Sequence, residues 1–147
     1  MSGKLAGVDK IVAQVNKIIK DLDAGNLSVG FMGGEYPNNG PLVAAVAFWN
    51  EFGVPSHNQP ARPFFRRMIA KESPGWGVKI AQLARANNLD GKRALNQLGE
   101  DIKGALHESI AALMSPALST KTAAAKGSPK PLVETAQMLN SIKFKVE

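Results

Sequence analysis

The feature that most constrains the fold is a long stretch of helical spacing between Arg93 and Met114. Apolar residues recur there at steps of three or four, while most charged residues lie off that line. This spacing puts the apolar side chains on one face of an α-helix, which we expect to be the longest in the chain. The apolar positions are Leu95, Leu98, Ile102, Leu106, Ile110 and Leu113.

Two glycines lie inside this predicted helix. Gly99 and Gly104 each cost up to about 1 kcal/mol relative to alanine in a helix interior. They either weaken the helix or mark a place where another helix approaches it closely. Ser115 and Pro116 end the helix, because proline lacks the N–H that continues the hydrogen bonding.

A second amphipathic pattern occupies the N-terminal part of the chain. Apolar residues between Val8 and Leu22 recur at three- and four-residue steps, with polar residues on the opposite face. We expect a helix here that ends at Gly25-Asn26. Residues 27–31 and 142–146 instead alternate apolar with polar or small residues, which predicts two strands.

The segment between Pro41 and Gly53 permits two interpretations. Pro41 suits the first turn of a helix over residues 42–51, and Gly53 suits its end. Val43 and Val46 are β-branched, so a buried strand is the alternative, although the alanines and bulky aromatics favour the helix.

Three shorter helical patterns complete the chain. One runs from Pro63 to about Glu72 and is expected to break at Ser73-Pro74-Gly75. The next runs from Trp76 to about Asn87, followed by a turn at 87–91. A short helix over 132–139 precedes the last strand.

Residues 115–131 form a low-complexity segment with three lysines, three prolines and no acid. Such a composition cannot bury enough apolar surface to order itself, so we expect a mobile loop. At 147 residues and 44% hydrophobic composition, the chain suits one domain spanning residues 1–147.

These elements predict a small α+β domain with an N-terminal helix, a long central helix and a short antiparallel sheet. Two strands alone seldom make a stable sheet in water. Either a third strand lies near residues 34–48, or a neighbouring subunit completes the sheet on oligomerisation.

Composition excludes several classes of protein. The chain has no cysteine, which rules out disulfides and thiolate metal sites. Its longest nearly uncharged apolar stretch, residues 41–49, is far shorter than the ~20 residues that span a bilayer, and its N-terminus lacks the apolar core of a signal peptide. The net charge of +6 permits contact with nucleic acid and equally favours solubility.

No catalytic or metal-binding constellation is evident. His57 and His107 stand far apart without ligand motifs, and we expect both to be exposed to solvent. The chain has no nucleophile motif, and the glycines between Gly30 and Gly34 lack a phosphate-binding pattern. We therefore expect no catalytic, cofactor-binding or metal-binding residue and no enzymatic activity.

The block from Phe48 to Arg67 carries the most distinctive residues. An acid near a helix C-terminus meets the negative end of the helix dipole, at a cost of about 0.3–1 kcal/mol. Glu51 is therefore expected to pair with Arg62 or Arg66, and an unpaired surface glutamate is an equally open alternative. Because Arg62 precedes Pro63, it should be extended, and we expect it to reach towards Glu51.

Arginines flank two aromatic residues in the same block, which permits two interpretations. In one interpretation, the phenylalanines stack on bases and the arginines hold phosphates. The lysines of residues 115–131 would then contact the DNA backbone non-specifically. Alternatively the phenylalanines dock into the core as one helical turn, and at least one is expected there. The residues concerned are Arg62, Phe64, Phe65, Arg66, Arg67 and Met68, with Lys121, Lys126 and Lys130.

Three motifs together resemble the signature of tail-completion and neck proteins of long-tailed bacteriophages, in the virion morphogenesis group. The first two correspond to the NEFG…PARPF signature of that family. In the third, relatives commonly have a glycine where Ala136 stands, so the turn there is expected to be helical. The motifs are Asn50-Glu51-Phe52-Gly53, Pro60-Ala61-Arg62-Pro63-Phe64-Phe65-Arg66 and Pro131-Leu132-Val133-Glu134-Thr135…Leu139-Asn140-Ser141-Ile142.

The resemblance implies a non-enzymatic α+β subunit that forms a ring, expected to be a hexamer, at the head–tail junction or upper tail. Such proteins join the tail to a DNA-filled head or terminate the tail tube. The implied partners are further copies of the chain, the connector or head-completion proteins, the tube or terminator proteins, and packaged DNA through non-specific contact. The implied location is the virion, after assembly in the host cytoplasm. A tail terminator and a basic nucleic-acid-binding module are the alternatives.

Overall fold

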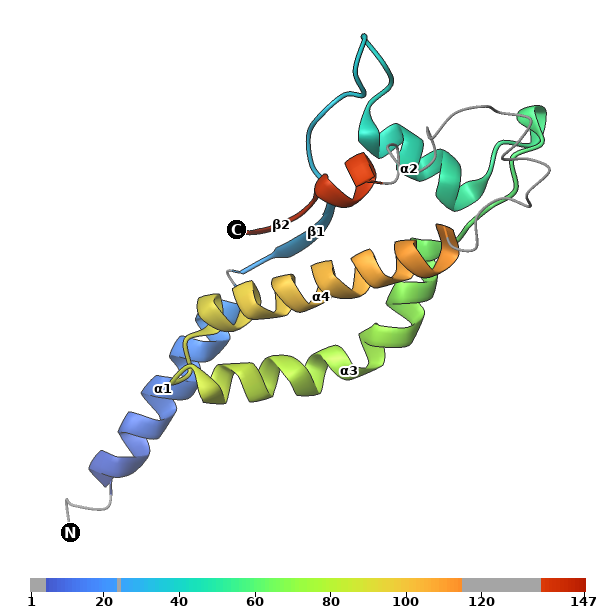
Figure 1. Ribbon diagram of the computed structural model, residues 1–147. Coiled ribbons are helices and arrows are strands. Elements are labelled where there is room, and N and C mark those ends of the chain that lie inside the picture. The colour runs from blue at the N-terminus through green and yellow to red at the C-terminus, as the bar shows by residue number, and fades with distance from the viewer. Residues whose placement is uncertain (1–4, 24, 115–135) are drawn as a thin grey trace.

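The computed structural model describes residues 5–23, 25–114 and 136–147 (Figure 1). Helices dominate, and a two-stranded antiparallel ribbon accompanies them, so the predicted α+β class is confirmed. The helices are α1 (Leu5–Asp23), α2 (Val43–Phe52), α3 (Phe64–Ala86) and α4 (Gly91–Met114), with a 3-10 turn, η1 (Pro55–His57). The strands are β1 (Leu27–Phe31) and β2 (Ile142–Val146).

Helix α4 is the centre of the fold, as its apolar spacing predicts. Five of the six predicted apolar positions are buried, and Leu113 is half-buried. Its first turn is capped by Asp90, whose Oδ1 accepts a hydrogen bond from the Arg93 N–H at 3.0 Å. Helix α3 packs along α4 and is joined to it by the predicted turn (Figure 1).

The predicted break at Ser73-Pro74-Gly75 is wrong. Helix α3 continues through Pro74, and Figure 1 shows that it bends partway along its length. Proline is a usual cause of such a bend, because it removes one backbone hydrogen bond without ending the helix. Phe64 and Met68 before Pro74, and Ala84 after it, are all buried. Packing on both sides of the bend therefore holds the helix together.

The ribbon lies against α4, with Leu27 opposite Val146 and Phe31 opposite Ile142. A Cβ on Gly99 would lie 2.5 Å from Cδ2 of Phe144. Gly99 thus marks a close approach, although the neighbour is the ribbon and not a helix, whereas Gly104 has open space around it.

The third strand predicted near residues 34–48 is absent from the described residues. Residues 43–52 form α2, which confirms the helix over the strand, and only an isolated bridge joins Glu35 to Leu42. The cover that α4 gives to one face of the ribbon accounts for its stability without a third strand. Completion of the sheet by a neighbouring subunit remains a prediction.

Helix α1 was expected from its amphipathic spacing, and its position is unusual. It contacts α4 but otherwise extends away from the other elements (Figure 1). Most of its apolar face is exposed, at 45–61% for each side chain. These residues are Val8, Ile11, Val12, Val15 and Ile19.

The predicted C-terminal helix is confirmed for residues 136–140, which are helical and include Ala136. Met138 in this turn and Ile142 after it are both 1% exposed and belong to the core. The beginning of that predicted helix and the predicted mobile loop at 115–131 lie outside the described residues.

Candidate functional site

Glu51 joins the two motifs of the distinctive block. It lies in the last turn of α2 and is 5% exposed. Its Oε2 accepts a hydrogen bond from the Phe65 N–H at 2.8 Å, and its Oε1 accepts one from the Arg66 N–H at 3.2 Å. These N–H groups belong to the first turn of α3, where no intrahelical acceptor exists. Glu51 therefore caps a neighbouring helix.

This capping role explains why a negatively charged residue occupies the C-terminal end of α2, where the helix dipole disfavours it. The negative end of the α2 dipole disfavours Glu51, but the positive end of α3 favours it, because anions bind well at helix N-termini. Helix α3 begins after Pro63, which offers no side-chain cap. The carboxylate from α2 supplies the missing acceptor.

Arg66 is the arginine that pairs with Glu51. Its Nε lies 2.8 Å from Glu51 Oε1, and its Nη2 donates to the Glu51 carbonyl oxygen at 3.2 Å. The alternative of an unpaired surface glutamate is wrong. The Arg62 N–H donates to the Asn50 carbonyl oxygen at 2.7 Å. The first turn of α3 brings Arg66 beside the carboxylate.

Asn50 ties the loop to the helix. Its Nδ2 donates to the Val46 carbonyl oxygen at 3.0 Å and to Met138 Sδ at 3.7 Å. Its Oδ1 accepts a bond from Gln59 Nε2 at 3.1 Å. Asn50 thereby connects α2, the loop after it and the C-terminal turn.

Gly53 permits the chain to turn sharply after α2. Its φ is +76°, and its N–H donates to the Trp49 carbonyl oxygen at 2.7 Å. A Cβ there would lie 2.7 Å from both Ala61 N and Gln59 O. Only glycine fits, because the backbone after Pro60 passes directly against it.

Phe52 completes the arrangement on the outer side. Its ring lies 4.7 Å from the Arg66 guanidinium carbon, a cation–π contact, and 4.7 Å from the Phe48 ring. Every residue of the first motif thus has a structural role. We call this set, Asn50, Glu51, Phe52, Gly53 and Arg66, the α2–α3 clamp.

The two phenylalanines of the second motif differ. Phe64 is 1% exposed and meets Phe31 edge-on at 6.1 Å between ring centroids. The prediction that at least one lies in the core is confirmed. Phe65 is half-buried and lines an apolar groove of about 250 Å³ beside α2. Pro60 begins the second motif, and Pro63 is the residue immediately before α3.

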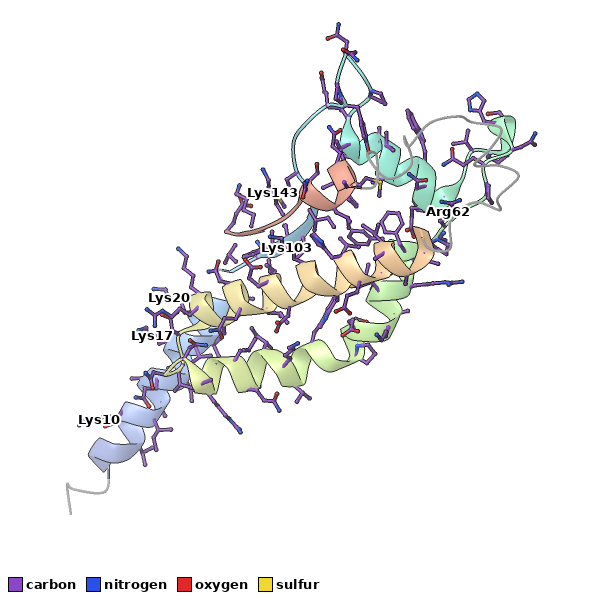
Figure 2. The ribbon with its side chains drawn as sticks, in the orientation of Figure 1. Lys10, Lys17, Lys20, Arg62, Lys103 and Lys143 are labelled. Carbon is purple, nitrogen blue, oxygen red and sulfur yellow. The ribbon has the colours of Figure 1, made fainter. Side chains whose placement is uncertain are left out.

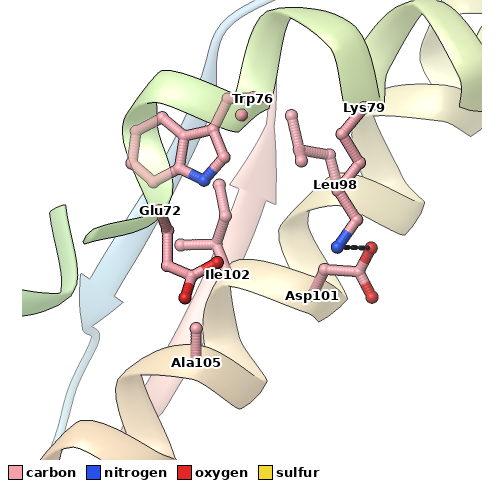
Figure 3. Close-up of a pocket in the computed structure, with 8 residues that line it drawn as sticks. Glu72, Trp76, Lys79, Leu98, Asp101, Ile102 and Ala105 are labelled. Atoms are coloured by element: carbon pink, nitrogen blue, oxygen red, sulfur yellow. Dashed lines mark ion pairs between the residues drawn. The ribbon is translucent and has the colours of Figure 1, made fainter. Parts of the chain in front are cut away.

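A second, smaller cavity lies between α3 and α4 (Figure 3). Its volume is about 70 Å³, and Trp76, Leu98 and Ile102 contribute apolar walls. Lys79 and Asp101 form an ion pair of 3.0 Å at its side. A cavity of this size holds water and not a substrate, since ligand pockets typically measure about 300–1,000 Å³.

Other chemistry receives no support from the described residues. They contain no cluster of acidic and histidine side chains that could hold a metal ion. His57 is exposed as predicted, but His107 is half-buried, and the expectation of an exposed side chain there is wrong. The Nε2 atom of His107 is buried and has no hydrogen-bond partner among the described residues. None of the helices described is long and apolar enough to cross a membrane.

Basic residues occur on several of the described elements. Figure 2 labels examples on α1, α4 and β2 and near the start of α3. The labelled residues are Lys10, Lys17, Lys20, Arg62, Lys103 and Lys143.

Comparison with known proteins identifies no relative. No protein-family model, no curated protein and no solved structure matches this chain.

Proposed function

We propose that the chain is a structural subunit of a long-tailed bacteriophage virion, which acts in tail completion at the head–tail junction or upper tail. It works by assembling as a ring with copies of itself and by joining neighbouring connector and tail proteins. It needs no cofactor and catalyses no reaction. The resemblance of its two central motifs to tail-completion proteins is the basis of this proposal.

The α2–α3 clamp is the observation that supports it. Glu51 and Gly53, which are hard to explain as surface residues, have definite structural partners. The clamp holds α2 so that Phe48, Trp49 and Phe52 are 43–60% exposed. Rigid presentation of aromatic side chains suits a protein that binds other proteins, because such residues carry much of the binding energy at interfaces.

The nucleic-acid alternative is weakened by the same geometry. Phe64 is buried and cannot stack on a base, and Arg66 is engaged by Glu51. Base stacking needs an exposed aromatic face. Of the two phenylalanines suggested for base stacking, only Phe65 retains partial exposure.

Disruption of the gene in the phage that carries it tests the proposal. The expected result is an accumulation of DNA-filled heads and unattached tails of normal length, seen by electron microscopy, with infectivity restored by the wild-type chain in trans. Overlong tails would instead indicate the tail-terminator alternative. Normal infectious particles that lack the chain would contradict the proposal.

A further inference from the structure

The chain carries two exposed apolar faces that have no cover among the described residues. The first is the stripe on α1, which we define as Val8, Ile11, Val12, Val15 and Ile19. Helices of soluble proteins normally turn such a stripe towards a core. Because α1 extends away from the other elements (Figure 1), its stripe faces no core formed by the described residues.

The second face belongs to α2. Glu51 is the one charged residue among its ten, and most of the others are apolar. A helix that is apolar on all sides is normally buried. Only one side of α2 packs into the core, through Val43 and Ala47. The groove of about 250 Å³ adjoins that side, and the buried residues Ala47, Glu51 and Phe64 form part of its wall. Its other lining residues are Phe31, Ala44, Phe48, Phe52, Phe65 and Arg66.

We propose that the α1 stripe of one copy docks into the α2 groove of a neighbouring copy. This inference rests on the proposed function, in that it assigns the two surfaces through which the ring would form. The occupant of the groove is therefore a helix of the same protein, and not a cofactor or a small molecule.

The shapes of the two faces favour this pairing. An exposed helix is convex and the groove is concave, whereas two grooves placed together would enclose empty space and lose packing contacts. The groove is smaller than typical small-molecule pockets of about 300–1,000 Å³. It suits one or two aliphatic side chains that enter from a helix.

The width of the α1 stripe argues against two α1 helices pairing with each other. Val8, Val12, Val15 and Ile19 follow the alternating four- and three-residue spacing of a coiled-coil seam, and Ile11 widens the stripe beyond it. A two-stranded coiled coil covers the narrow seam alone, and a wider face needs a broader surface. The aromatic side of α2 is such a surface.

The exposed area is also of the right size. At roughly 150–250 Å² per aromatic side chain, the exposed parts of Phe48, Trp49 and Phe52 amount to about 230–380 Å². A standard interface buries about 800 Å² on each partner. These three residues would thus supply a third to a half of one side.

The arrangement in space makes the contact head-to-tail. Helices α1 and α2, which carry the stripe and line the groove, lie at opposite ends of the described molecule (Figure 1). Each copy would therefore bind one neighbour through its groove and another through its stripe. Contacts of this kind close into rings or extend as filaments.

Cysteine cross-linking tests the pairing, because the natural chain has no cysteine. Val12→Cys and Ala44→Cys are prepared as separate variants of the full chain, mixed, and treated with a short bismaleimide. We expect cross-linked dimers in the mixture and none in either variant alone. Val78→Cys, at an isolated exposed position on α3, serves as the control partner for Ala44→Cys and should give no product.

Each other outcome overturns the proposal. Dimers of Val12→Cys alone would indicate pairing of two α1 helices, and dimers of Ala44→Cys alone would indicate pairing of two grooves. Products within one chain, in a variant that carries both cysteines, would show that α1 folds onto its own groove. The absence of any product would show that the two surfaces do not meet.

Charge variants give a second readout. Ile11→Lys should weaken self-association by roughly tenfold or more in sedimentation velocity, as expected for a central interface residue, while Val78→Lys should leave it unchanged. Unchanged association of Ile11→Lys would overturn the pairing. If the chain still assembles and tails still join heads, the proposed function stands and only the docking surfaces are wrong. A chain that never self-associates and is dispensable for the virion would defeat both.

Discussion

At the scale of single residues, Glu51 explains why the two motifs occur together. One carboxylate caps α3, pairs with Arg66 and is anchored in α2. The Arg66 side chain is 56% exposed, so solvent screens the ion pair and leaves it worth less than about 1 kcal/mol. The backbone hydrogen bonds therefore contribute more than the charge pair does.

Glu51→Ala and Arg66→Ala should consequently differ. Glu51→Ala leaves two N–H groups at the start of α3 without an acceptor and should lower the free energy of unfolding by about 2–3 kcal/mol. Arg66→Ala removes the ion pair and the contact with Phe52 and should cost about 1 kcal/mol. Urea unfolding of the two variants measures the difference. Equal losses would show that the charge pair, and not the cap, is what matters.

Phe64 and Phe48 form a second contrasting pair. Phe64→Ala should cost about 3–5 kcal/mol, because it opens a cavity in the core, enough to threaten the folding of a small domain. Phe48 is 60% exposed, and Phe48→Ala should change stability by less than about 0.5 kcal/mol. Melting temperatures of both variants provide the check. A stable Phe64→Ala protein would be incompatible with the packing described.

The sequence predicted part of this site, and the missing part has a physical reason. The position of Glu51 at a helix C-terminus suggested Arg62 or Arg66 as a partner, while an unpaired surface glutamate stayed equally open. Whether Arg62 or Arg66 meets Glu51 depends on where α3 begins. The capping of α3 by Glu51 depends on how α2 and α3 lie relative to each other. Local sequence carries no pattern for either feature.

At the scale of elements, α4 and the ribbon fit together through Gly99. The spacing of apolar residues predicted α4 closely, because one face of a buried helix follows a strict period. Pro74 was misread for the opposite reason: local sequence indicates a break, but packing on both sides of the bend overrides it. The two strands were predicted from alternation. A third strand near residues 34–48, one of the two alternatives, is absent from the described residues, where α4 covers one face of the ribbon.

Gly99 and Gly104 provide a matched comparison within α4. Gly104→Ala should stabilise the protein by about 0.5–1 kcal/mol, because alanine favours the helix and open space surrounds the site. Gly99→Ala should destabilise it by about 1–3 kcal/mol, because the new methyl group overlaps the Phe144 ring. Chemical denaturation of the two variants is the measurement. If both substitutions stabilised the protein, the Phe144 ring could not lie against Gly99 as described.

At the scale of the whole molecule, the described residues form a folded body with apolar surfaces at both ends. The exposure of the α1 stripe could not be predicted, because an amphipathic pattern does not say whether its core is in the same chain or in another. An assembling subunit accounts for both exposed faces, since surfaces left open in one copy are buried between copies.

Locating the chain in purified phage particles tests the proposed function most directly. Purified phage, with the chain fused to a small electron-dense or antibody-detectable tag, is imaged by electron microscopy. The account predicts a label confined to the head–tail junction or the upper end of the tail, present in several copies per particle. Mature infectious particles without any label, from cells that express the tagged chain, would contradict it.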